Sequence, residues 1–381
     1  MTMRLNWPVR VAGMLVAGAA GLLLGACSSG PDKPKPTELS PNAALIGVRL
    51  AWTSRIGPVN FPLDIHVINN SVSLAGGDGS VATIDGTSGA DQWRVMVAGG
   101  IAGGVGSDGR LTAVVTRANE LLALERGREV WREKLGALSF TAPLVAGERV
   151  FVMTADRAVT AFDGRSGRRL WTYTRAGDIP LSVHQSSVML AVGDTLVVGI
   201  SGRLVGLNPL TGSVRWEAPI ATARGTNDVE RLVDLVGRVS REGDVICARA
   251  FQTAIGCVNA ARGNLLWAKP AVGGQGVHGD ADFVFGTEAD GQVIAWRRSD
   301  GEKAWTSERL KYRGLTAPLV IGRTVAVGDA TGLVHFLSRQ DGSLMNRMPT
   351  DGSAIVASPV VVGNTLVVVT EKGGVFGFRP E

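Results

Sequence analysis

The residues that usually carry out chemistry in proteins do not have, in this sequence, the spacing that any of the common reactions requires. Four histidines are scattered along the chain, at His66, His184, His278 and His335. No Cys or His lies two to four residues from another, which is the spacing that paired metal ligands use. A Gly-x-Ser-x-Gly elbow, which would expose a nucleophilic serine, is also missing. The sequence therefore predicts no metal, no cofactor and no catalytic residue.

One glycine cluster formally matches a dinucleotide-binding motif. Gly104, Gly106 and Gly109 have the Gly-x-Gly-x-x-Gly spacing. That motif binds phosphate because a helix begins directly after it, whereas residues 111–115 here have the β-strand pattern Leu-Thr-Ala-Val-Val. Without a helix N-terminus the cluster is interpreted as a turn.

Cys27 has the clearest chemical signature in the chain. Arg4 and Arg10 precede an apolar stretch, residues 11–24, which is shorter than a membrane-spanning helix and typical of a secretory signal. The stretch ends in Leu-Gly-Ala-Cys27, which resembles the lipobox of bacterial lipoproteins. The resemblance implies that residues 1–26 are a signal peptide and that Cys27 is acylated on its thiol and its amine, which anchors a protein firmly. The alternative is an ordinary signal peptide that happens to contain a cysteine.

The residues after Cys27 are predicted to form a flexible tether. Ser28 and Ser29 follow the cysteine without an adjacent Asp, which by the same resemblance implies sorting to the outer membrane, facing the periplasm. Prolines recur among polar residues up to position 41. Residues 27–43 are therefore expected to be extended and disordered.

Charge and composition exclude two classes of partner. The net charge is +5, with no basic run and no interleaved aromatic residues, so neither nucleic-acid binding nor a polybasic membrane patch is predicted. Nine Trp against two Tyr is an unusual ratio. The positions of the tryptophans therefore carry information.

Most of these tryptophans mark an internal repeat. They recur at intervals of 38 to 51 residues, at Trp52, Trp93, Trp131, Trp171, Trp216, Trp267 and Trp305, and one further step of 41 reaches Asn346, a degenerate copy. A glycine lies four residues before each position from the second onward: Gly89, Gly127, Gly167, Gly212, Gly263, Gly301 and Gly342. Each period also contains β-strand patterns, such as residues 149–154 and 158–162, separated by tight turns. A period near 40 with four short strands is typical of a propeller blade.

The sequence thus predicts an all-β fold, an eight-bladed β-propeller over residues 44–381. The chain ends in a third strand, residues 374–378, with no Trp strand after it, and residues 48–52 are a Trp strand with nothing before it. The N-terminal strand should complete the last blade and remove an exposed edge. The Trp rings are expected to wedge between adjacent blades.

The repeats resemble those of quinoprotein dehydrogenases, which suggests an enzymatic alternative, a periplasmic quinone-dependent dehydrogenase. Those enzymes are much longer, carry a disulfide between adjacent cysteines and bind calcium through clustered carboxylates. This chain has no adjacent Cys pair and places its carboxylates in turns. The repeats are therefore interpreted as a non-catalytic scaffold.

The lipobox, the eight repeats, the length and the ring closure together resemble the BamB family of outer-membrane protein assembly factors. The resemblance covers nearly the whole mature chain. It implies binding to the periplasmic POTRA domains of the β-barrel insertase BamA, membership of a complex with other assembly lipoproteins, and nascent outer-membrane proteins as further ligands.

Two neighbouring connections between blades are unusually long, and these are predicted to bind the partner. They span residues 175–187 and 218–240, and inserted loops on a rigid scaffold often carry binding residues. By resemblance to the family, the contact residues are Leu181, Val183 and His184 in the first connection and Asp234 in the second, although His184 replaces an Arg and Val236 replaces a second Asp of the family pattern. Arg231 is added as a second charge in the same connection. The apolar side chains are expected to be anchors and the charges to orient the partner at the rim. The alternative is that both are simply long loops.

Cys247 and Cys257 flank a predicted hairpin, residues 245–250 and 254–259. A connection of three or five residues would place them opposite each other, close enough for a disulfide, and one of two residues would offset them. Two small buried residues are the alternative interpretation, since Cys257 occupies the position of Ala161 in the repeat.

Overall fold

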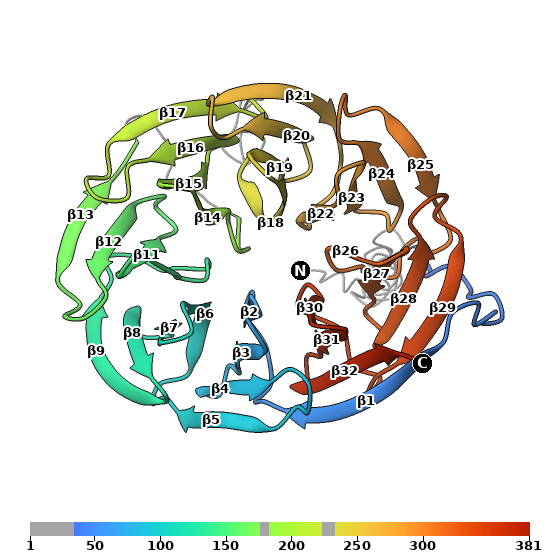
Figure 1. Ribbon diagram of the computed structural model, residues 1–381, viewed down its shortest axis with the longest axis horizontal. Helices are drawn as coiled ribbons and strands as arrows, with labels where there is room; N and C mark the ends of the chain where they lie inside the picture. The colour runs from blue at the N-terminus through green and yellow to red at the C-terminus, as the bar shows by residue number, and fades with distance from the viewer. Residues whose placement is uncertain (1–33, 176–182, 223–232) are drawn as a thin grey trace, which may run out of the picture. The chain divides into compact units, whose positions relative to one another are not determined.

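Strand pairing divides the protein into eight antiparallel sheets of four strands each, which form the blades of a ring (Figure 1). The computed structural model describes residues 34–175, 183–222 and 233–381. The predicted eight-bladed β-propeller, closed by the N-terminal strand, is confirmed. In the described ranges no helix is long and apolar enough to cross a membrane.

The first four blades follow one another along the chain. Their strands are β2 (His66–Ile68), β3 (Ser71–Ala75), β4 (Ser80–Asp85) and β5 (Asp91–Met96) in blade 1; β6 (Ile101–Ser107), β7 (Leu111–Thr116), β8 (Glu120–Glu125) and β9 (Arg128–Lys134) in blade 2; β10 (Leu144–Ala146), β11 (Arg149–Met153), β12 (Val159–Asp163) and β13 (Arg169–Tyr173) in blade 3; and β14 (Met189–Val192), β15 (Thr195–Ile200), β16 (Arg203–Leu207) and β17 (Val214–Pro219) in blade 4.

The last four blades end with the blade that joins the two ends of the chain. Their strands are β18 (Leu235–Glu242), β19 (Val245–Ala250), β20 (Ala254–Asn259) and β21 (Asn264–Pro270) in blade 5; β22 (Val277–Gly279), β23 (Phe283–Thr287), β24 (Val293–Arg297) and β25 (Lys303–Ser307) in blade 6; β26 (Leu319–Ile321), β27 (Thr324–Gly328), β28 (Leu333–Ser338) and β29 (Leu344–Pro349) in blade 7; and β30 (Val360–Val362), β31 (Thr365–Val369), β32 (Gly374–Pro380) and β1 (Val48–Arg55) in blade 8.

The two faces of the ring carry different kinds of connecting segment. The first strand of each blade lies nearest the axis and the fourth lies at the rim (Figure 1). Because successive strands are antiparallel, the links between blades all emerge on one face, the connection face, which includes residues 135–143, 183–188 and 308–318. The opposite face, the turn face, carries the short turns between the first and second strands and between the third and fourth strands of a blade. These turns include residues 193–194, 322–323 and 339–343.

Each tryptophan of the repeat packs against the next blade, as predicted. A Cβ added to Gly167 would lie 2.8 Å from the Trp131 ring, so only glycine leaves room for the indole, and its φ of 73° also favours glycine. The indole N–H of Trp131 donates to the Gly164 carbonyl at 2.9 Å in the same turn. We call this arrangement the inter-blade clasp. Its contact between indole and glycine recurs in the pairs Trp52–Gly89, Trp93–Gly127, Trp171–Gly212, Trp216–Gly263, Trp267–Gly301 and Trp305–Gly342.

Within its own blade each indole lies over a small residue of the third strand. Trp171 pairs with Ala161, and Trp216 with Gly206, where a Cβ would approach the indole to 2.3 Å. Blade 7 inverts the arrangement, because Phe336 pairs there with Asn346. The aromatic ring has moved from the fourth strand to the third, where Phe336 packs against Leu366 and Phe378 of blade 8 and lines a cavity of about 350 Å³ between the two blades.

The two cysteines of blade 5 lie opposite each other in a hairpin, as predicted for a connection of three residues. Strands β19 and β20 are joined by three residues, Cys247 pairs with Cys257, and the two are joined by a disulfide. Both are fully buried. The Arg298 guanidinium, from the third-to-fourth-strand turn of blade 6, lies 3.3 Å from the Cys247 Sγ, so the bridge also contacts the neighbouring blade.

The predicted tether is shorter than expected. Residues 1–33, including Cys27, lie outside the described ranges, but residues 37–46 run along blade 7 instead of forming part of a free linker. Leu45 N–H donates to Met345 O at 2.7 Å, and Thr37 N–H donates to Lys311 O at 3.0 Å. The proline content could not reveal that Leu39 packs against an apolar cluster between blades 6 and 7.

The inter-blade clasp predicts that Gly167→Ala destabilises the protein by about 2–4 kcal/mol, from strain at positive φ together with overpacking against Trp131. Gly193→Ala is the matched control. Its φ is 57°, but an added Cβ meets nothing within 4 Å, so only the backbone strain, about 1–2 kcal/mol, is expected. Denaturant unfolding followed by tryptophan fluorescence measures both, and equal losses would show that the indole contact contributes little.

Candidate functional site

The two long connections meet on the connection face. Ser187 Oγ donates to Leu235 O at 2.9 Å, and Gly237 N–H donates to Ser186 O at 2.9 Å. The backbone of Val183 donates to the Asp234 carboxylate at 3.0 Å. Two of the residues chosen from sequence, Val183 and Asp234, are therefore in direct contact although they lie in different connections. Leu181 and Arg231 fall outside the described residues.

Asp234 is held inside the protein and not at its rim. Its side chain is only 9% exposed and forms an ion pair of 2.8 Å with Arg157, which lies in the turn between β11 and β12. The expectation that Asp234 is an exposed rim charge is wrong, because Arg157 and the Val183 amide occupy its oxygens. Its contribution to partner binding stays a prediction, acting through the position of the chain at Val183.

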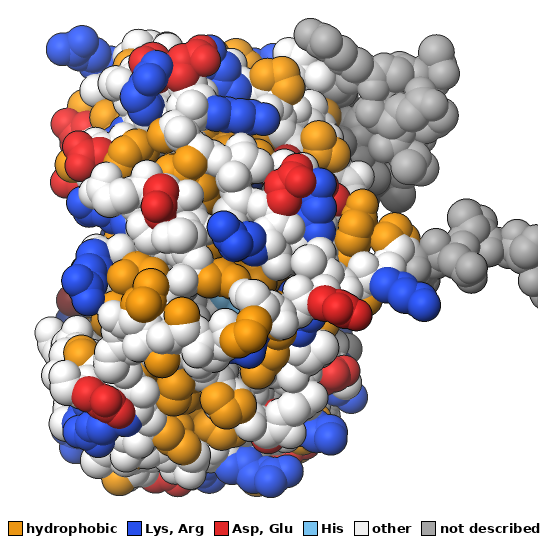
Figure 2. Space-filling view, turned by 90° about the vertical axis from the view of Figure 1, so that its right-hand side faces the viewer, with side chains coloured by type: hydrophobic (Ala, Val, Ile, Leu, Met, Phe, Trp, Pro, Cys, Tyr) orange, Lys and Arg blue, Asp and Glu red, His pale blue; other side chains and the backbone are white. Residues whose placement is uncertain are grey.

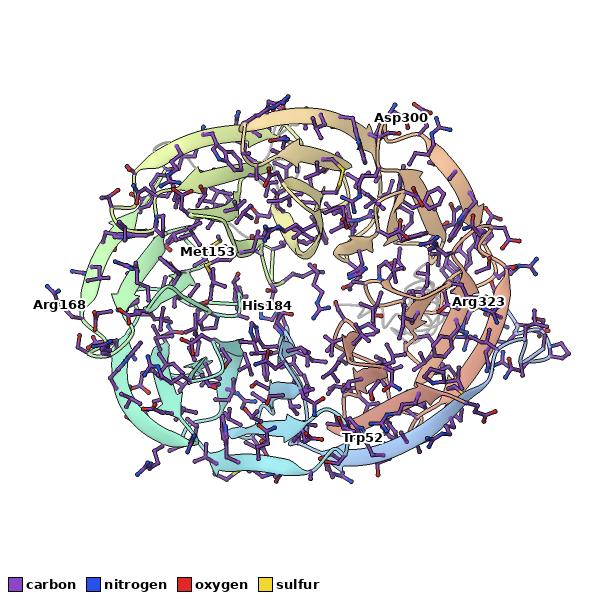
Figure 3. All side chains as sticks on the ribbon, in the orientation of Figure 1. Trp52, Met153, Arg168, His184, Asp300 and Arg323 are labelled. Atoms are coloured by element: carbon purple, nitrogen blue, oxygen red, sulfur yellow. A yellow bond between two sulfur atoms is a disulfide. The ribbon has the colours of Figure 1, made fainter. Side chains whose placement is uncertain are left out.

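Val183 and His184 lie at the surface of the same cluster. Val183 is half-buried and His184 is exposed. The His184 ring packs against Phe140, from the connection between blades 2 and 3, with 4.1 Å between ring centroids. Figure 3 shows His184 toward the axis of the ring, whereas Arg168 and Asp300 point outward at the rim. Three consecutive connections thus combine into one surface, with Phe140 as a residue that sequence reasoning missed.

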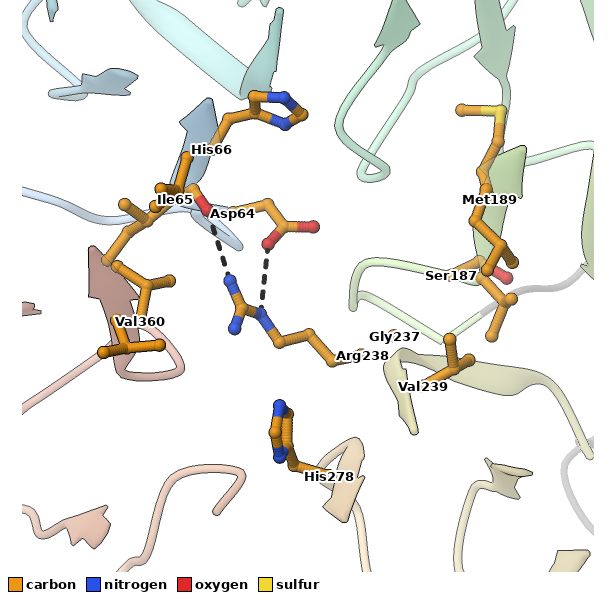
Figure 4. Close-up of a pocket in the computed structure, with 14 residues that line it drawn as sticks. Asp64, Ile65, His66, Ser187, Met189, Gly237, Arg238, Val239, His278 and Val360 are labelled. Atoms are coloured by element: carbon orange, nitrogen blue, oxygen red, sulfur yellow. Dashed lines mark hydrogen bonds and ion pairs between the residues drawn. The ribbon is translucent and has the colours of Figure 1, made fainter. Parts of the chain in front are cut away.

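The central channel contains a second group of polar side chains. A cavity of about 420 Å³ is lined by residues of several blades, among them Asp64, His66, Arg238 and His278 (Figure 4). Arg238, from β18, reaches across the channel. Its guanidinium donates to Pro359 O at 3.1 Å and Ile65 O at 3.2 Å, and lies 3.6 Å from the Asp64 carboxylate. One side chain thus links blade 5 to blades 1 and 8 through the axis.

The channel histidines are neutral at neutral pH. Burial, together with the nearby cations Arg238 and Arg298, lowers the pKa of His278 to about 4. Its Nδ1 accepts a hydrogen bond from Val320 N–H at 3.2 Å, which fixes the ring. Burial likewise lowers the pKa of His66. Among the described residues no group of three or more His, Cys, Asp or Glu could hold a metal ion, so the carboxylate cluster that a quinoprotein-type calcium site needs is not found there.

Sequence motifs outside these two groups are structural. Gly104 and Gly106 lie on strand β6, and Gly109 lies in the turn that follows it, as the strand pattern after them predicted. A Cβ at Gly106 would lie 1.8 Å from the Pro143 carbonyl, so the close approach of the next connection explains that glycine. His335 is fully buried and bonded to Asp329.

These features define a propeller scaffold of quinoprotein-type repeats, with its channel bridged by an arginine and its candidate contact residues on one face. The family model described as outer membrane protein assembly factor BamB matches residues 77–307. The chain is 38% identical to the outer membrane protein assembly factor BamB of Burkholderia pseudomallei (strain K96243), over 99% of this chain and 100% of that protein. It is 36% identical to the protein of that name from Bordetella pertussis (strain Tohama I), over 94% of each. The chain therefore belongs to the BamB family.

Solved structures agree with this assignment at the level of the fold. The crystal structure of BamB from Moraxella catarrhalis superposes with a TM-score of 0.78 at 28% identity, covering 87% of this chain and 99% of that one. A quinohemoprotein alcohol dehydrogenase from Comamonas testosteroni superposes with a TM-score of 0.67 at 15% identity, covering 90% and 78%. The likeness to the dehydrogenase shows a shared propeller and nothing about activity.

The buried pair predicts how Asp234 variants behave. Asp234→Ala removes a buried carboxylate that pairs with Arg157 and accepts from the Val183 amide, which should cost about 3–5 kcal/mol. Because buried pairs are screened weakly, the loss should be nearly the same at low and high salt. Asp194→Ala removes an exposed pair with Arg215 and serves as the control, with little change in stability. Denaturant unfolding at both salt concentrations measures the effect, and a strong salt dependence for Asp234→Ala would contradict burial of the pair.

Proposed function

We propose that this protein is a non-catalytic assembly factor for outer-membrane proteins, held at the periplasmic face of the outer membrane by acyl chains on Cys27. Membership of the BamB family supports this role, since its members are named for it. The lipobox-like sequence before Cys27 supports the anchor. The partners would be the periplasmic POTRA domains of the barrel insertase BamA and the other lipoproteins of that complex, with nascent outer-membrane proteins as further ligands.

The observation that carries the proposal is the joining of the two long connections. Hydrogen bonds attach residues 183–187 of the first connection to the buried Asp234 and to the start of β18, which fixes this part of the first connection on the ring. The Arg157–Asp234 pair holds that surface from beneath. Such an arrangement presents Val183 and His184 in a fixed geometry, so these two residues would cost a partner little entropy to order.

The contact surface predicts that Leu181→Asp with Val183→Asp abolishes partner capture while the ring stays folded. Apolar anchors at the centre of an interface contribute roughly 2 kcal/mol or more each, and two new carboxylates would also have to be desolvated. Capture is measured by pull-down from solubilised outer membranes with identification by mass spectrometry. Leu210→Asp is the control, because Leu210 is 61% exposed and lies on the turn face. Full capture by the double variant at unchanged thermal stability would show that the interface lies on another face of the ring.

The anchor predicts that Cys27→Ser releases a folded protein into the periplasm, because the acyl chains supply nearly all of the membrane affinity. Cell fractionation measures the distribution, in a strain that lacks the insertase partner so that protein binding does not retain the variant. Continued fractionation with the outer membrane in that strain would rule out Cys27 as the anchor.

A further inference from the structure

The turn between the third and fourth strands of blade 2 is shorter than the matching turns of the other blades. Only Arg126 and Gly127 join β8 to β9, whereas four to six residues join the third and fourth strands of blades 1 and 3 to 7. Gly127 still rests against the Trp93 ring, since an added Cβ would lie 3.2 Å from it. The turn thus keeps the glycine of the inter-blade clasp but has no counterpart of residues 164–166, which precede that glycine in blade 3.

The short turn leaves the Trp93 indole without the acceptor that longer turns provide. Five other indoles of the repeat donate their N–H to a carbonyl in the turn of the next blade, at 2.8 to 3.2 Å: Trp52, Trp131, Trp171, Trp267 and Trp305. The Trp93 N–H, like that of Trp216, has no hydrogen-bond acceptor among the described residues. A ligand beside Trp93 could therefore accept a hydrogen bond from it.

A cavity of about 350 Å³ lies beside Trp93, between blades 1 and 2. It opens at the turn face, since its lining includes Arg110 from the turn between β6 and β7 and Arg126 from the short turn. Its volume is at the lower end of the range of ligand sites in proteins, which suits a ligand of one sugar ring.

The walls of this cavity carry hydroxyl groups where other blades have none. Ser73 pairs with Thr83 in blade 1, both are buried, and their hydroxyls are 2.8 Å apart. The matching pairs in the other seven blades contain no hydroxyl: Ala113–Ala123, Phe151–Ala161, Val197–Gly206, Cys247–Cys257, Phe285–Ala295, Ala326–Phe336 and Val367–Gly377. Two hydroxyls have two O–H donors and use one between them, so this pair keeps a donor and free lone pairs for a ligand.

The mouth of the cavity is positively charged. Its lining contains two arginines and no carboxylate. Arg126 is exposed and has no ion pair among the described residues, and Arg110 has only a loose, exposed pair with Glu125 at 3.8 Å. By contrast, the rim around β29, which faces the viewer in Figure 2, carries Lys and Arg interspersed with Asp and Glu. Unpaired guanidinium groups at the mouth favour a carboxylate or a phosphate there.

We propose that this cavity binds an anionic sugar. The sugar hydroxyls would bond to Ser73, Thr83 and the Trp93 N–H, and the carboxylate or phosphate would lie at Arg126. An apolar ligand would leave the buried hydroxyls and the indole N–H unpaired, which is costly, and a small anion alone would not use them. The cavity lies on the face opposite to residues 183–187, so the ring could hold this ligand and a protein partner together. The inference does not depend on the proposed function.

The test is an NMR titration of the full-length protein labelled with ¹⁵N in its tryptophan indoles. The Trp93 signal is identified as the one that is lost in Trp93→Phe. Sodium glucuronate and glucose 6-phosphate are added separately, so that the two arms distinguish a carboxylate from a phosphate. At least one should shift the Trp93 signal saturably, with a Kd of about 1 mM or below, as expected for a ligand of this size. Glucose, which lacks the charge, and acetate, which lacks the hydroxyls, should each bind at least about tenfold more weakly.

Two variants assign the binding to this cavity. Arg126→Ala should weaken binding of the anionic sugar about tenfold, the effect of losing one charge-assisted hydrogen bond. Arg168→Ala is the matched control, because Arg168 is an exposed arginine in the corresponding turn of blade 3 (Figure 3) and should leave the affinity unchanged. Ser73→Ala with Thr83→Ala gives blade 1 the alanine pair of blade 2, so the ring should stay folded while binding falls about tenfold or more.

The absence of a saturable shift of the Trp93 signal with both anionic sugars would overturn the inference. Glucose or acetate that binds as tightly as the anionic sugars would also overturn it. Unchanged affinity in Arg126→Ala would show that the sugar binds elsewhere, and this variant changes only an exposed side chain, so it decides the question even if the hydroxyl variant fails to fold. Partner capture is measured separately, so none of these results bears on the proposed function.

Discussion

The inter-blade clasp is the interaction on which the ring depends. Twisted sheets packed around an axis diverge toward the rim, and an indole fills that gap where smaller side chains would leave it open. Each ring fits only because glycine stands in the next turn and a small residue lies opposite in its own blade, as at Trp131, Gly167 and Ala123. A blade therefore holds its neighbour with residues from both, and no blade is complete alone.

The inter-blade clasp is missing between blades 7 and 8, where the ends of the chain meet, and other contacts join these two blades. Blade 8 has no turn between β32 and β1, so it lacks the glycine on which an indole would rest. Phe336 supplies an aromatic side chain from the third strand, and the Asn346 side-chain amide donates to Ile46 O of the N-terminal segment. Closure then comes from backbone pairing of β1 with β32 from Val48–Pro380 to Arg55–Gly374.

Sequence periodicity was sufficient to predict the fold because each repeat contains the tryptophan and the glycine that form the inter-blade clasp. The spacing of Trp and Gly predicted eight blades, and the unpaired strand patterns at the two ends predicted closure. The candidate site depends instead on contacts between distant repeats. Arg157 lies 77 positions before Asp234 (234 − 157), and the axial reach of Arg238 to Ile65 spans four blades. Neither contact leaves a periodic signal, so an aspartate in a long loop was indistinguishable from a surface charge.

The two faces are held by different forces, and this difference bears on function. The inter-blade clasps, which combine indole packing with an N–H donor, lie at the turn face, whereas buried ion pairs lie at the connection face: Arg157–Asp234, Arg249–Glu288 and Arg313–Asp329. The hydrogen bonds from His335, Leu333 and Thr331 depress the pKa of Asp329 against the opposing effect of burial, so the carboxylate stays charged. Buried ion pairs add little net stability relative to apolar packing but are costly to break, and they act only in a defined geometry. A face whose links are fixed by buried ion pairs can present residues such as Val183 and His184 in one arrangement.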